Sequence, residues 1–255
     1  MQWDPAQYLR FADERLRPAL DLLARIGVEN PAEVVDLGCG TGNVSAILKR
    51  RWPDAAVTGV DGSAEMLARA AAEVPQCHFV QGDFATWTPA APVQVLYSNA
   101  ALHWLGGHAS LFPRLLGHVA PGGVFAVQMP AMHAQPLRAL QNELAATGPW
   151  AAHLADVPAA PAILEPGQYW DLLRPRCAAL DIWETIYLHA LRGDDAVVQW
   201  ARGTSLRPFL DRLPEPLKAE YLQAYTQAVR PHYEQRADRT TLLPFRRLFL
   251  IAQAN

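Results

Sequence analysis

The segment Glu33–Gly42, which reads Glu-Val-Val-Asp-Leu-Gly-Cys-Gly-Thr-Gly, constrains the fold more than any other part of the chain. Its apolar start predicts a buried strand, and three glycines then follow at two-residue spacing before a helical pattern begins. Glycine permits a positive φ and lets a ligand lie against bare backbone, while the first amides of the next helix carry partial positive charge. The segment therefore predicts a strand–turn–helix unit that holds the polar end of a nucleotide-like cofactor.

The spacing of these glycines narrows the class of cofactor. Gly38-x-Gly40-x-Gly42 differs from the G-x-G-x-x-G of dinucleotide sites, which disfavours a nicotinamide dehydrogenase. Asp36, just before the turn, would repel a pyrophosphate but suit an amino group. The run D-L-G-C-G-T-G resembles motif I of class I S-adenosylmethionine (SAM) methyltransferases, whose cofactor carries an ammonium and no phosphate. A glycine-rich turn without a ligand is the alternative, but glycines at this spacing weaken a turn that has no use for them.

Polar residues follow three later predicted strands in the same way. Asp61 ends the segment 56–61, where a carboxylate accepts hydrogen bonds from ribose hydroxyls in doubly wound nucleotide sites. Asp83 follows a predicted strand at 77–81, and the resemblance to methyltransferases implies that it accepts from the adenine amino group. Alone, such an aspartate is more often a cap or turn residue, so its order after Asp36 and Asp61 carries the prediction. Asn99 lies at the end of the next strand, in the loop expected beneath the sulfonium.

Three neighbours complete the predicted cofactor site. Gly62 follows Asp61 and opens a helix, on which Met66 is either an apolar wall for adenine or a core residue. Phe84 follows Asp83 directly.

Strand and helix patterns alternate along the first half of the chain, which predicts an α/β fold. Such alternation implies a doubly wound, mostly parallel sheet with helices on both faces, and ligands at the carboxyl ends of the strands. Two more strands are expected at 178–191 and at 242–252, the latter inserted at the sheet edge, which makes seven. We expect one domain over residues 1–255, with segments 1–30, 131–176 and 194–240 forming a helical lid that selects the methyl acceptor. Strands are predicted near 33–37, 56–61, 77–81, 93–98 and 123–129, and helices at 5–26, 194–203 and 215–235.

Composition limits the partners and the compartment. The chain of 255 residues has a formal net charge of −3, which argues against nucleic acid or an anionic membrane as partner. Three cysteines without a C-x-x-C pair predict neither a disulfide frame nor a metal site. Without a basic apolar leader or a run of about twenty apolar residues, we expect a cytoplasmic protein, either a monomer or a weak homodimer.

Cationic and aromatic residues in the expected lid suggest an anionic substrate. Tyr8, Phe11, Arg15 and Leu22 share one face of the first predicted helix. Arg15 on that face either binds a carboxylate of SAM or of the substrate, or packs its stem while its head reaches water.

Further candidates come from the second half of the chain and from the loop after the fourth strand. Arg207 lies at a helix–loop junction, and Tyr225 shares a helix face with Tyr221. Arg246 and its neighbour on a strand point to opposite faces, so one of them can enter a pocket. Arginine binds carboxylate through a two-pronged fork, and converging arginines therefore suit a multiply charged carboxylate.

His103 and Trp104 lie beside the expected methyl position. His103 is a candidate general base, or else a hydrogen-bond donor that orients the acceptor, and Trp104 a pocket wall.

Six segments spread over nearly the whole chain resemble the trans-aconitate 2-methyltransferase family. They are W-D-P-x-x-Y-L-x-F-x-x-E-R-x-R-P-A, N-A-A-L-H-W-L, G-V-F-A-V-Q-M-P, L-D-I-W-E-T-x-Y, L-R-P-F-L and L-P-F-R-R-L-F-x-I-A, between Trp3 and Ala252. The resemblance implies methyl transfer from SAM to one carboxylate of the small tricarboxylate trans-aconitate. The reacting carboxylate is then expected to contact only weaker donors such as Tyr8 or His103. His103 stands where glutamine is expected in relatives, and the Ala/Pro-rich stretch at 134–166 departs from the family pattern.

Two other functions remain open from the sequence. One is a class I methyltransferase for another small carboxylic acid or an acyl-carrier acceptor. A carrier would favour a basic docking surface, but no Lys/Arg cluster of that kind appears, and only the three residues Lys49–Arg51 fall together. The other is a SAM-binding module without turnover. Both keep the fold and the cofactor; the first changes the acceptor, and the second has none.

Overall fold

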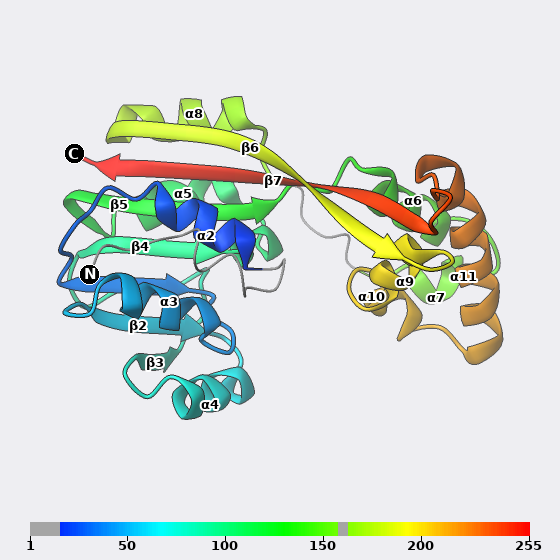
Figure 1. Cartoon of the computed structure of the whole chain (residues 1–255), viewed down its shortest axis with the longest axis horizontal. Coiled ribbons are helices and arrows are strands. Elements are labelled where there is room, and N and C mark those ends of the chain that lie inside the picture. The colour runs from blue at the N-terminus through cyan, green and yellow to red at the C-terminus, as the bar shows by residue number, and fades with distance from the viewer. Residues whose placement is uncertain (1–15, 158–162) are drawn as a thin grey trace. The chain divides into compact units, whose positions relative to one another are not determined.

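The computed structural model describes residues 16–157 and 163–255 (Figure 1). Tyr8, Phe11 and Arg15, and the first half of the predicted helix 5–26, lie outside the described residues. Apart from short 3-10 turns, the elements are α2 (Arg17–Ala24), β1 (Glu33–Leu37), α3 (Asn43–Arg51), β2 (Ala56–Asp61), α4 (Ala64–Glu73), β3 (His78–Gln81), β4 (Val93–Asn99), α5 (His108–Leu116), β5 (Val119–Pro130), α6 (Pro136–Ala145), α7 (Ala151–Leu154), α8 (Pro166–Leu173), β6 (Cys177–Arg192), α9 (Ala196–Arg202), α10 (Arg207–Leu210), α11 (Glu215–Val229) and β7 (Thr240–Ala254).

The strands form one seven-stranded sheet in the order β3-β2-β1-β4-β5-β7-β6. Strands β1 to β5 pair in parallel, and β7 runs antiparallel to β5. The prediction of a doubly wound, mostly parallel sheet is therefore confirmed. The strand order reverses between β1 and β4, and doubly wound sheets bind ligands at the carboxyl ends of the strands beside this reversal.

The boundaries of β1 and β2 match the predicted ranges, whereas three later elements differ. Strand β5 begins at Val119, four residues before the predicted start at 123. The predicted helix 215–235 ends at Val229, because Pro231 has no N–H group to continue the helical hydrogen bonds, and a short 3-10 turn follows. Strand β7 is internal, and β6 takes the sheet edge. The four consecutive buried residues from Arg247 show that this part of β7 is also covered on both faces of the sheet.

By its internal packing the chain divides into two compact units. The first comprises residues 1–130, 162–185 and 247–255, and the second comprises 131–161 and 186–246. Of the helices in the expected lid, α6, α7, α9, α10 and α11 belong to the second unit, whereas α2 and α8 belong to the first. That the segments 1–30, 131–176 and 194–240 act as a lid stays a prediction.

In the first unit, helix α8 packs against α5 through aromatic and polar contacts. His108 is buried, contacts the hydroxyl of Tyr169 through Nδ1, and lies 3.0 Å from the carbonyl oxygen of Leu102 through Nε2. Phe112 packs against both Tyr169 and Phe125. Burial lowers the pKa of His108, so the imidazole is neutral near pH 7.

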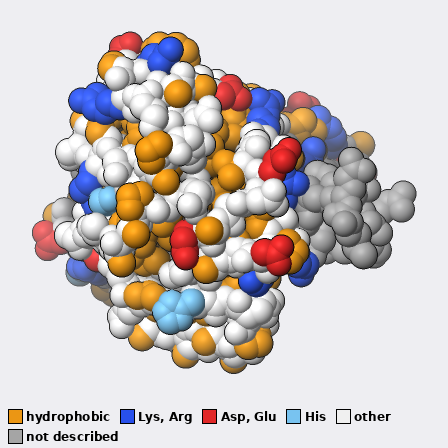
Figure 2. Space-filling model, turned by 90° about the vertical axis from the view of Figure 1, so that its left-hand side faces the viewer, with side chains coloured by type: hydrophobic (Ala, Val, Ile, Leu, Met, Phe, Trp, Pro, Cys, Tyr) orange, Lys and Arg blue, Asp and Glu red, His pale blue; other side chains and the backbone are white. Residues whose placement is uncertain are grey.

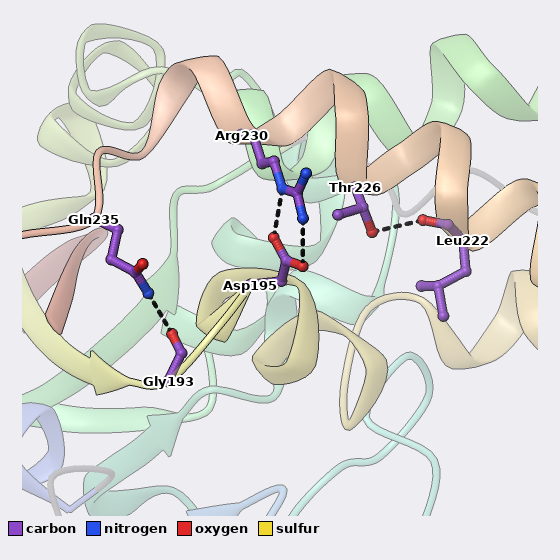
Figure 3. A network of polar contacts seen from close by, with 6 residues as sticks. All are labelled: Gly193, Asp195, Leu222, Thr226, Arg230 and Gln235. Atoms are coloured by element: carbon purple, nitrogen blue, oxygen red, sulfur yellow. Dashed lines mark hydrogen bonds and ion pairs between the residues drawn. The ribbon is translucent and has the colours of Figure 1, made fainter. Parts of the chain in front are cut away.

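The second unit has an apolar interior of its own and a polar network at one end (Figure 3). Arg230, just after α11, donates from Nε and Nη2 to the two carboxylate oxygens of Asp195, at 2.8 and 2.9 Å. Gln235 donates to the carbonyl oxygen of Gly193, and within α11 Thr226 donates to that of Leu222. These contacts tie the segment after α11 to the turn before α9.

None of the helices built from the described residues combines the length and the apolar character needed to cross a membrane. Figure 2 shows one face of the molecule, on which the positive and negative side chains of the described residues are interspersed.

Candidate functional site

The glycine turn after β1 has the backbone geometry that its sequence predicts. Gly38, Gly40 and Gly42 have φ values of +85°, +54° and +79°, a region that side chains with a Cβ rarely adopt. The amides of Gly38 and Cys39 both donate to the carbonyl oxygen of Val60, at 2.7 and 3.1 Å. The turn is thereby anchored to the neighbouring strand β2.

The three glycines differ in what a Cβ would meet. At Gly38 it would lie 2.1 Å from the Cβ of Ala101, and at Gly42 it would lie 3.1 Å from the side chains of Ala70 and Phe79. At Gly40 the nearest atom is the Sδ of Met66, at 3.9 Å. Gly38 and Gly42 therefore serve close packing, whereas Gly40 leaves open space against its backbone.

Asp61 links the glycine turn to the turn after β2. Its Oδ2 accepts a hydrogen bond from the amide of Gly40, and its Oδ1 accepts one from the amide of Ser63, both at 2.9 Å. Each carboxylate oxygen has a further lone pair, and the side chain is only half-buried. A hydroxylated ligand beside Gly40 could donate to this carboxylate without disturbing the turn.

Asp36 is buried in β1 with 1% of its surface exposed. Its Oδ2 accepts a hydrogen bond of 2.7 Å from the hydroxyl of Ser45 on α3. Burial raises the pKa of Asp36 to about 7, the hydrogen bond from Ser45 offsets part of this, and the charge of Asp61 adds to it. Two carboxyl groups at neighbouring strand ends favour a positively charged ligand, because such a charge would stabilise the ionised form of Asp36.

The loop after β3 carries Asp83 and Phe84 and is held by Arg114 of α5. The guanidinium of Arg114 donates to the carbonyl oxygens of Phe84, Ala85 and Trp87 at 2.8–2.9 Å. Asp83 is exposed, and its Oδ1 accepts a hydrogen bond from the amide of Ala85. It therefore also stabilises the turn, which is the alternative role that the sequence suggested for it.

The side chains predicted to enclose adenine border the glycine turn. The Cζ of Phe84 lies 3.5 Å from the position that a Cβ on Gly38 would take. Met66 is 46% exposed on α4, so it is not a core residue. Gly62 is exposed at the end of β2.

The end of β4 brings three predicted site residues next to the glycine turn. Asn99 is the last residue of the strand, and its Oδ1 is buried with no hydrogen-bond donor among the described residues. Ala100 has a φ of +53°, which is a strained backbone conformation for a residue other than glycine. His103 and Trp104 follow on a 3-10 turn, with His103 half-buried, Trp104 58% exposed and their ring centroids 4.6 Å apart.

Strands β5 and β7 add polar groups on the same sheet. Gln128 on β5 is fully buried, and Arg247 on β7 donates from Nη1 to its Oε1 at 3.2 Å. Of the two neighbouring arginines on β7, Arg247 is the buried one, and Arg246 is half-buried on the opposite face. Burial thus distinguishes the two arginines, which the sequence could not do.

The remaining predicted substrate residues belong to the second unit. Arg207 begins α10 and is exposed. Tyr225 is fully buried, donates to the carbonyl oxygen of Leu137 at 2.8 Å and accepts from Gln141 at 3.2 Å. These contacts pack α11 against α6, a role that differs from the predicted contact with substrate. A hollow of about 360 Å³ in this unit is lined by none of the predicted residues.

The structure thus gathers most of the predicted cofactor residues at the carboxyl ends of β1, β2, β3 and β4. Sequence reasoning missed Arg114 and Gln128. Gln128 lies within the run G-V-F-A-V-Q-M-P, where a polar residue near the end of a buried strand is a signal that could have identified it. Arg114 left no comparable signal, because its contacts are to backbone carbonyl oxygens.

A family model described as a methyltransferase domain matches residues 34–123. The chain is 48% identical over 254 residues to a trans-aconitate 2-methyltransferase of Methylobacterium radiotolerans, covering 98% of each chain. It is 47% identical over 250 residues to the protein of that name from Azoarcus sp., again with 98% of each covered.

Solved structures share the fold at low identity. The YcgJ protein from Bacillus subtilis has a TM-score of 0.61 at 11% identity, covering 93% of this chain and 97% of that one. A phosphoethanolamine N-methyltransferase from Haemonchus contortus, in complex with S-adenosylmethionine, has a TM-score of 0.54 at 14% identity, covering 92% of this chain and 52% of that one. Nearly half of the residues are identical to those of the Methylobacterium and Azoarcus proteins along almost the full length. The chain therefore belongs to the trans-aconitate 2-methyltransferase family of class I SAM-dependent methyltransferases.

Proposed function

We propose that this protein transfers the methyl group of SAM to a carboxylate of trans-aconitate, giving a monomethyl ester and S-adenosylhomocysteine. The observation that carries the proposal is the near full-length identity of 48% to a trans-aconitate 2-methyltransferase, which extends well beyond the matched domain at 34–123. The polar residues at the ends of β1 to β4 support the cofactor part independently, through their geometry.

The first unit offers a partner for each part of the cofactor. Asp36 would stabilise its positive charge, Asp61 would accept from the ribose hydroxyls, and Asp83 would accept from the adenine amino group. Gly40 would lie against the ligand, and the Oδ1 of Asn99 would accept from the ammonium. This would supply the donor that the buried oxygen lacks among residues 16–157 and 163–255. The other residues of the proposed cofactor site are Gly38, Gly42, Gly62, Met66, Phe84 and Arg15.

When bound, SAM supplies a methyl group on a positively charged sulfur, a good leaving group. The carboxylate oxygen of the acceptor bonds to the methyl carbon as the carbon–sulfur bond breaks, and the electron pair stays on sulfur. A carboxylate is ionised at neutral pH, so no general base is required. The protein has to align oxygen, carbon and sulfur and to exclude water from the nucleophile.

His103 and Trp104 are proposed to position the acceptor at the end of β4. In this role His103 donates a hydrogen bond and does not remove a proton, while the exposed ring of Trp104 provides an apolar wall. Tyr8, Arg207 and Arg246 remain proposed substrate contacts. An Arg207→Ala variant with unchanged kcat/KM for trans-aconitate would exclude Arg207 from that list.

The direct test incubates the purified protein with SAM and trans-aconitate and analyses both products by mass spectrometry and NMR. We expect S-adenosylhomocysteine and one monomethyl ester in equal amounts. An Asp61→Ala variant serves as the control, because it should lose binding of SAM and with it the formation of both products. Consumption of SAM without the ester would contradict the proposed acceptor and leave the cofactor site intact.

A further inference from the structure

A row of polar side chains crosses three neighbouring strands near the carboxyl end of the parallel sheet. Asn99 on β4 is in register with Gln128 on β5, so both side chains lie on the same face. Gln128 is in turn paired with Phe249 on β7, and Arg247 lies two residues from Phe249 on that same face. The row therefore runs Asn99, Gln128, Arg247 across β4, β5 and β7, entirely within the first unit.

The amide of Gln128 is satisfied at one end only. Its Oε1 accepts from Nη1 of Arg247 at 3.2 Å, whereas its Nε2 is buried with no acceptor in the described part of the chain. The whole residue is 0% exposed, so water does not supply the missing acceptor from bulk solvent. Buried donors without a partner are rare and costly, and each therefore calls for an explanation.

The orientation of this amide is set by Arg247. A guanidinium has donors only, so it fixes the oxygen of the amide toward β7. The nitrogen of the same amide is left without an acceptor among the described residues. At the in-register position on β4, Asn99 has a buried Oδ1 that also lacks a partner in this part of the chain. A donor and an acceptor thus stand unmet at in-register positions of adjacent strands.

These two groups suit two different parts of a reacting pair. The oxygen of Asn99 can accept only from a donor, such as the ammonium of the cofactor. The nitrogen of Gln128 can donate only to an acceptor, such as a carboxylate oxygen. Because an amide is neutral, its hydrogen bond orients a carboxylate without the charge pairing that would reduce the nucleophilicity of the oxygen.

We propose that Gln128 positions the reacting carboxylate of the acceptor by donating to it from Nε2, and that Arg247 holds the amide in this orientation. The inference rests on the proposed function and assigns a contact within it. One carboxylate oxygen accepts from Gln128 while the other forms the new bond to the methyl carbon. The carbon–sulfur electron pair leaves with sulfur, and no proton is transferred in this step.

The test compares three variants in the full-length protein: Gln128→Met, Gln128→Glu and Gln253→Met. Methionine matches the size of glutamine and removes the donor, and glutamate keeps a partner for Arg247 but brings a negative charge. The control is Gln253, an exposed glutamine on β7, the strand that pairs with β5. Its side chain donates a hydrogen bond of 3.3 Å to the carbonyl oxygen of Gly122. The readouts are kcat and KM for trans-aconitate at saturating SAM, the Kd for SAM, and thermal stability.

We expect Gln128→Met to lower kcat/KM for trans-aconitate by about 10- to 100-fold, the usual cost of an unmade hydrogen bond to a charged group, with the Kd for SAM within about threefold of wild type. Gln128→Glu should lose more, because its carboxylate repels that of the acceptor. A merely structural role predicts the reverse order, since glutamate still pairs with Arg247 whereas methionine does not. Gln253→Met should keep wild-type kinetics.

Two results would overturn the assignment. Gln128→Met with wild-type kcat/KM excludes the contact, and a Kd for SAM that rises in proportion to the kinetic loss makes Gln128 a cofactor residue. Wild-type protein with no turnover of trans-aconitate contradicts the proposed function itself. Wild-type turnover that Gln128→Met retains contradicts only the role of Gln128.

Discussion

Replacing Asp36 by asparagine should make the stability of the ligand-free protein less dependent on pH between about 5 and 8. Burial raises the pKa of Asp36 from an ordinary value of 3.8 to about 7. The folded protein therefore keeps this proton up to about pH 7, while the unfolded chain loses it near pH 4. Stability from this group is fully present below pH 4 and is lost as pH rises toward 7.

The size of the effect follows from the two pKa values. Each pKa unit corresponds to about 1.4 kcal/mol. Relative to its value below pH 4, stability is therefore lower by about 4 kcal/mol at pH 8, where folded Asp36 is ionised, and by about 1.5 kcal/mol at pH 5, where only the unfolded chain has lost the proton. Asparagine cannot ionise, and its oxygen can still accept from Ser45. Its amide nitrogen gains no acceptor, which costs about 1–3 kcal/mol at every pH. The variant should therefore be more stable than wild type by about 1–3 kcal/mol at pH 8 and no more stable at pH 5.

The assay is urea unfolding at pH 5, 6, 7 and 8 without SAM, with Asp54→Asn as an exposed control. The difference in unfolding free energy between Asp36→Asn and wild type should grow by about 2–3 kcal/mol from pH 5 to pH 8. The same variant should bind SAM about tenfold more weakly or worse, because the negative charge facing the cation is gone. An unchanged difference at all four pH values would refute the raised pKa, and undiminished SAM binding would refute the electrostatic role.

Four further substitutions test how the cofactor site and the fold around it are built. Gly38→Ala should lower the unfolding free energy by about 2–4 kcal/mol in chemical unfolding, because the new Cβ would overlap that of Ala101. Gly40→Ala should lower it by only about 1–2 kcal/mol and should mainly weaken SAM binding, measured by titration calorimetry. Equal stability losses would contradict the separate roles of the two glycines. Arg114→Met should raise the Kd for SAM by about 5- to 30-fold, since three hydrogen bonds to the loop after β3 are lost, and a Kd equal to that of wild type would exclude this support. Tyr169→Phe should lower the unfolding free energy by about 1–2 kcal/mol with unchanged SAM affinity, and no loss of stability would show that its buried hydroxyl contact is not stabilising.

The parallel part of the fold could be predicted because local patterns determine it. Buried strands such as β1 and β2 read as short apolar runs, and each ends in a polar residue followed by a turn signal. The same patterns located Asp36, Asp61 and Asn99, because the ends of parallel strands meet at one edge of a sheet. Local sequence therefore carried most of the cofactor site.

Features that depend on contacts between distant segments could not be predicted in this way. The internal place of β7 follows from pairing with β5 more than a hundred residues earlier, which no local pattern encodes. The choice between Arg246 and Arg247 depends on which face of β7 is covered. Tyr225 looked like a ligand contact because its helix face is aromatic, yet the structure uses that face to pack α6. The chain's own packing thus competes with ligands for the same residue types.

The most direct test of the proposed function is to measure kcat/KM for S-adenosylhomocysteine formation with a panel of small acids, including trans-aconitate, cis-aconitate and citrate. We expect trans-aconitate to exceed every other acid by at least about tenfold, with its monomethyl ester as the product. Comparable or faster turnover of another acid would contradict the proposed acceptor. Tight SAM binding without turnover of any acid would contradict catalysis of this reaction altogether.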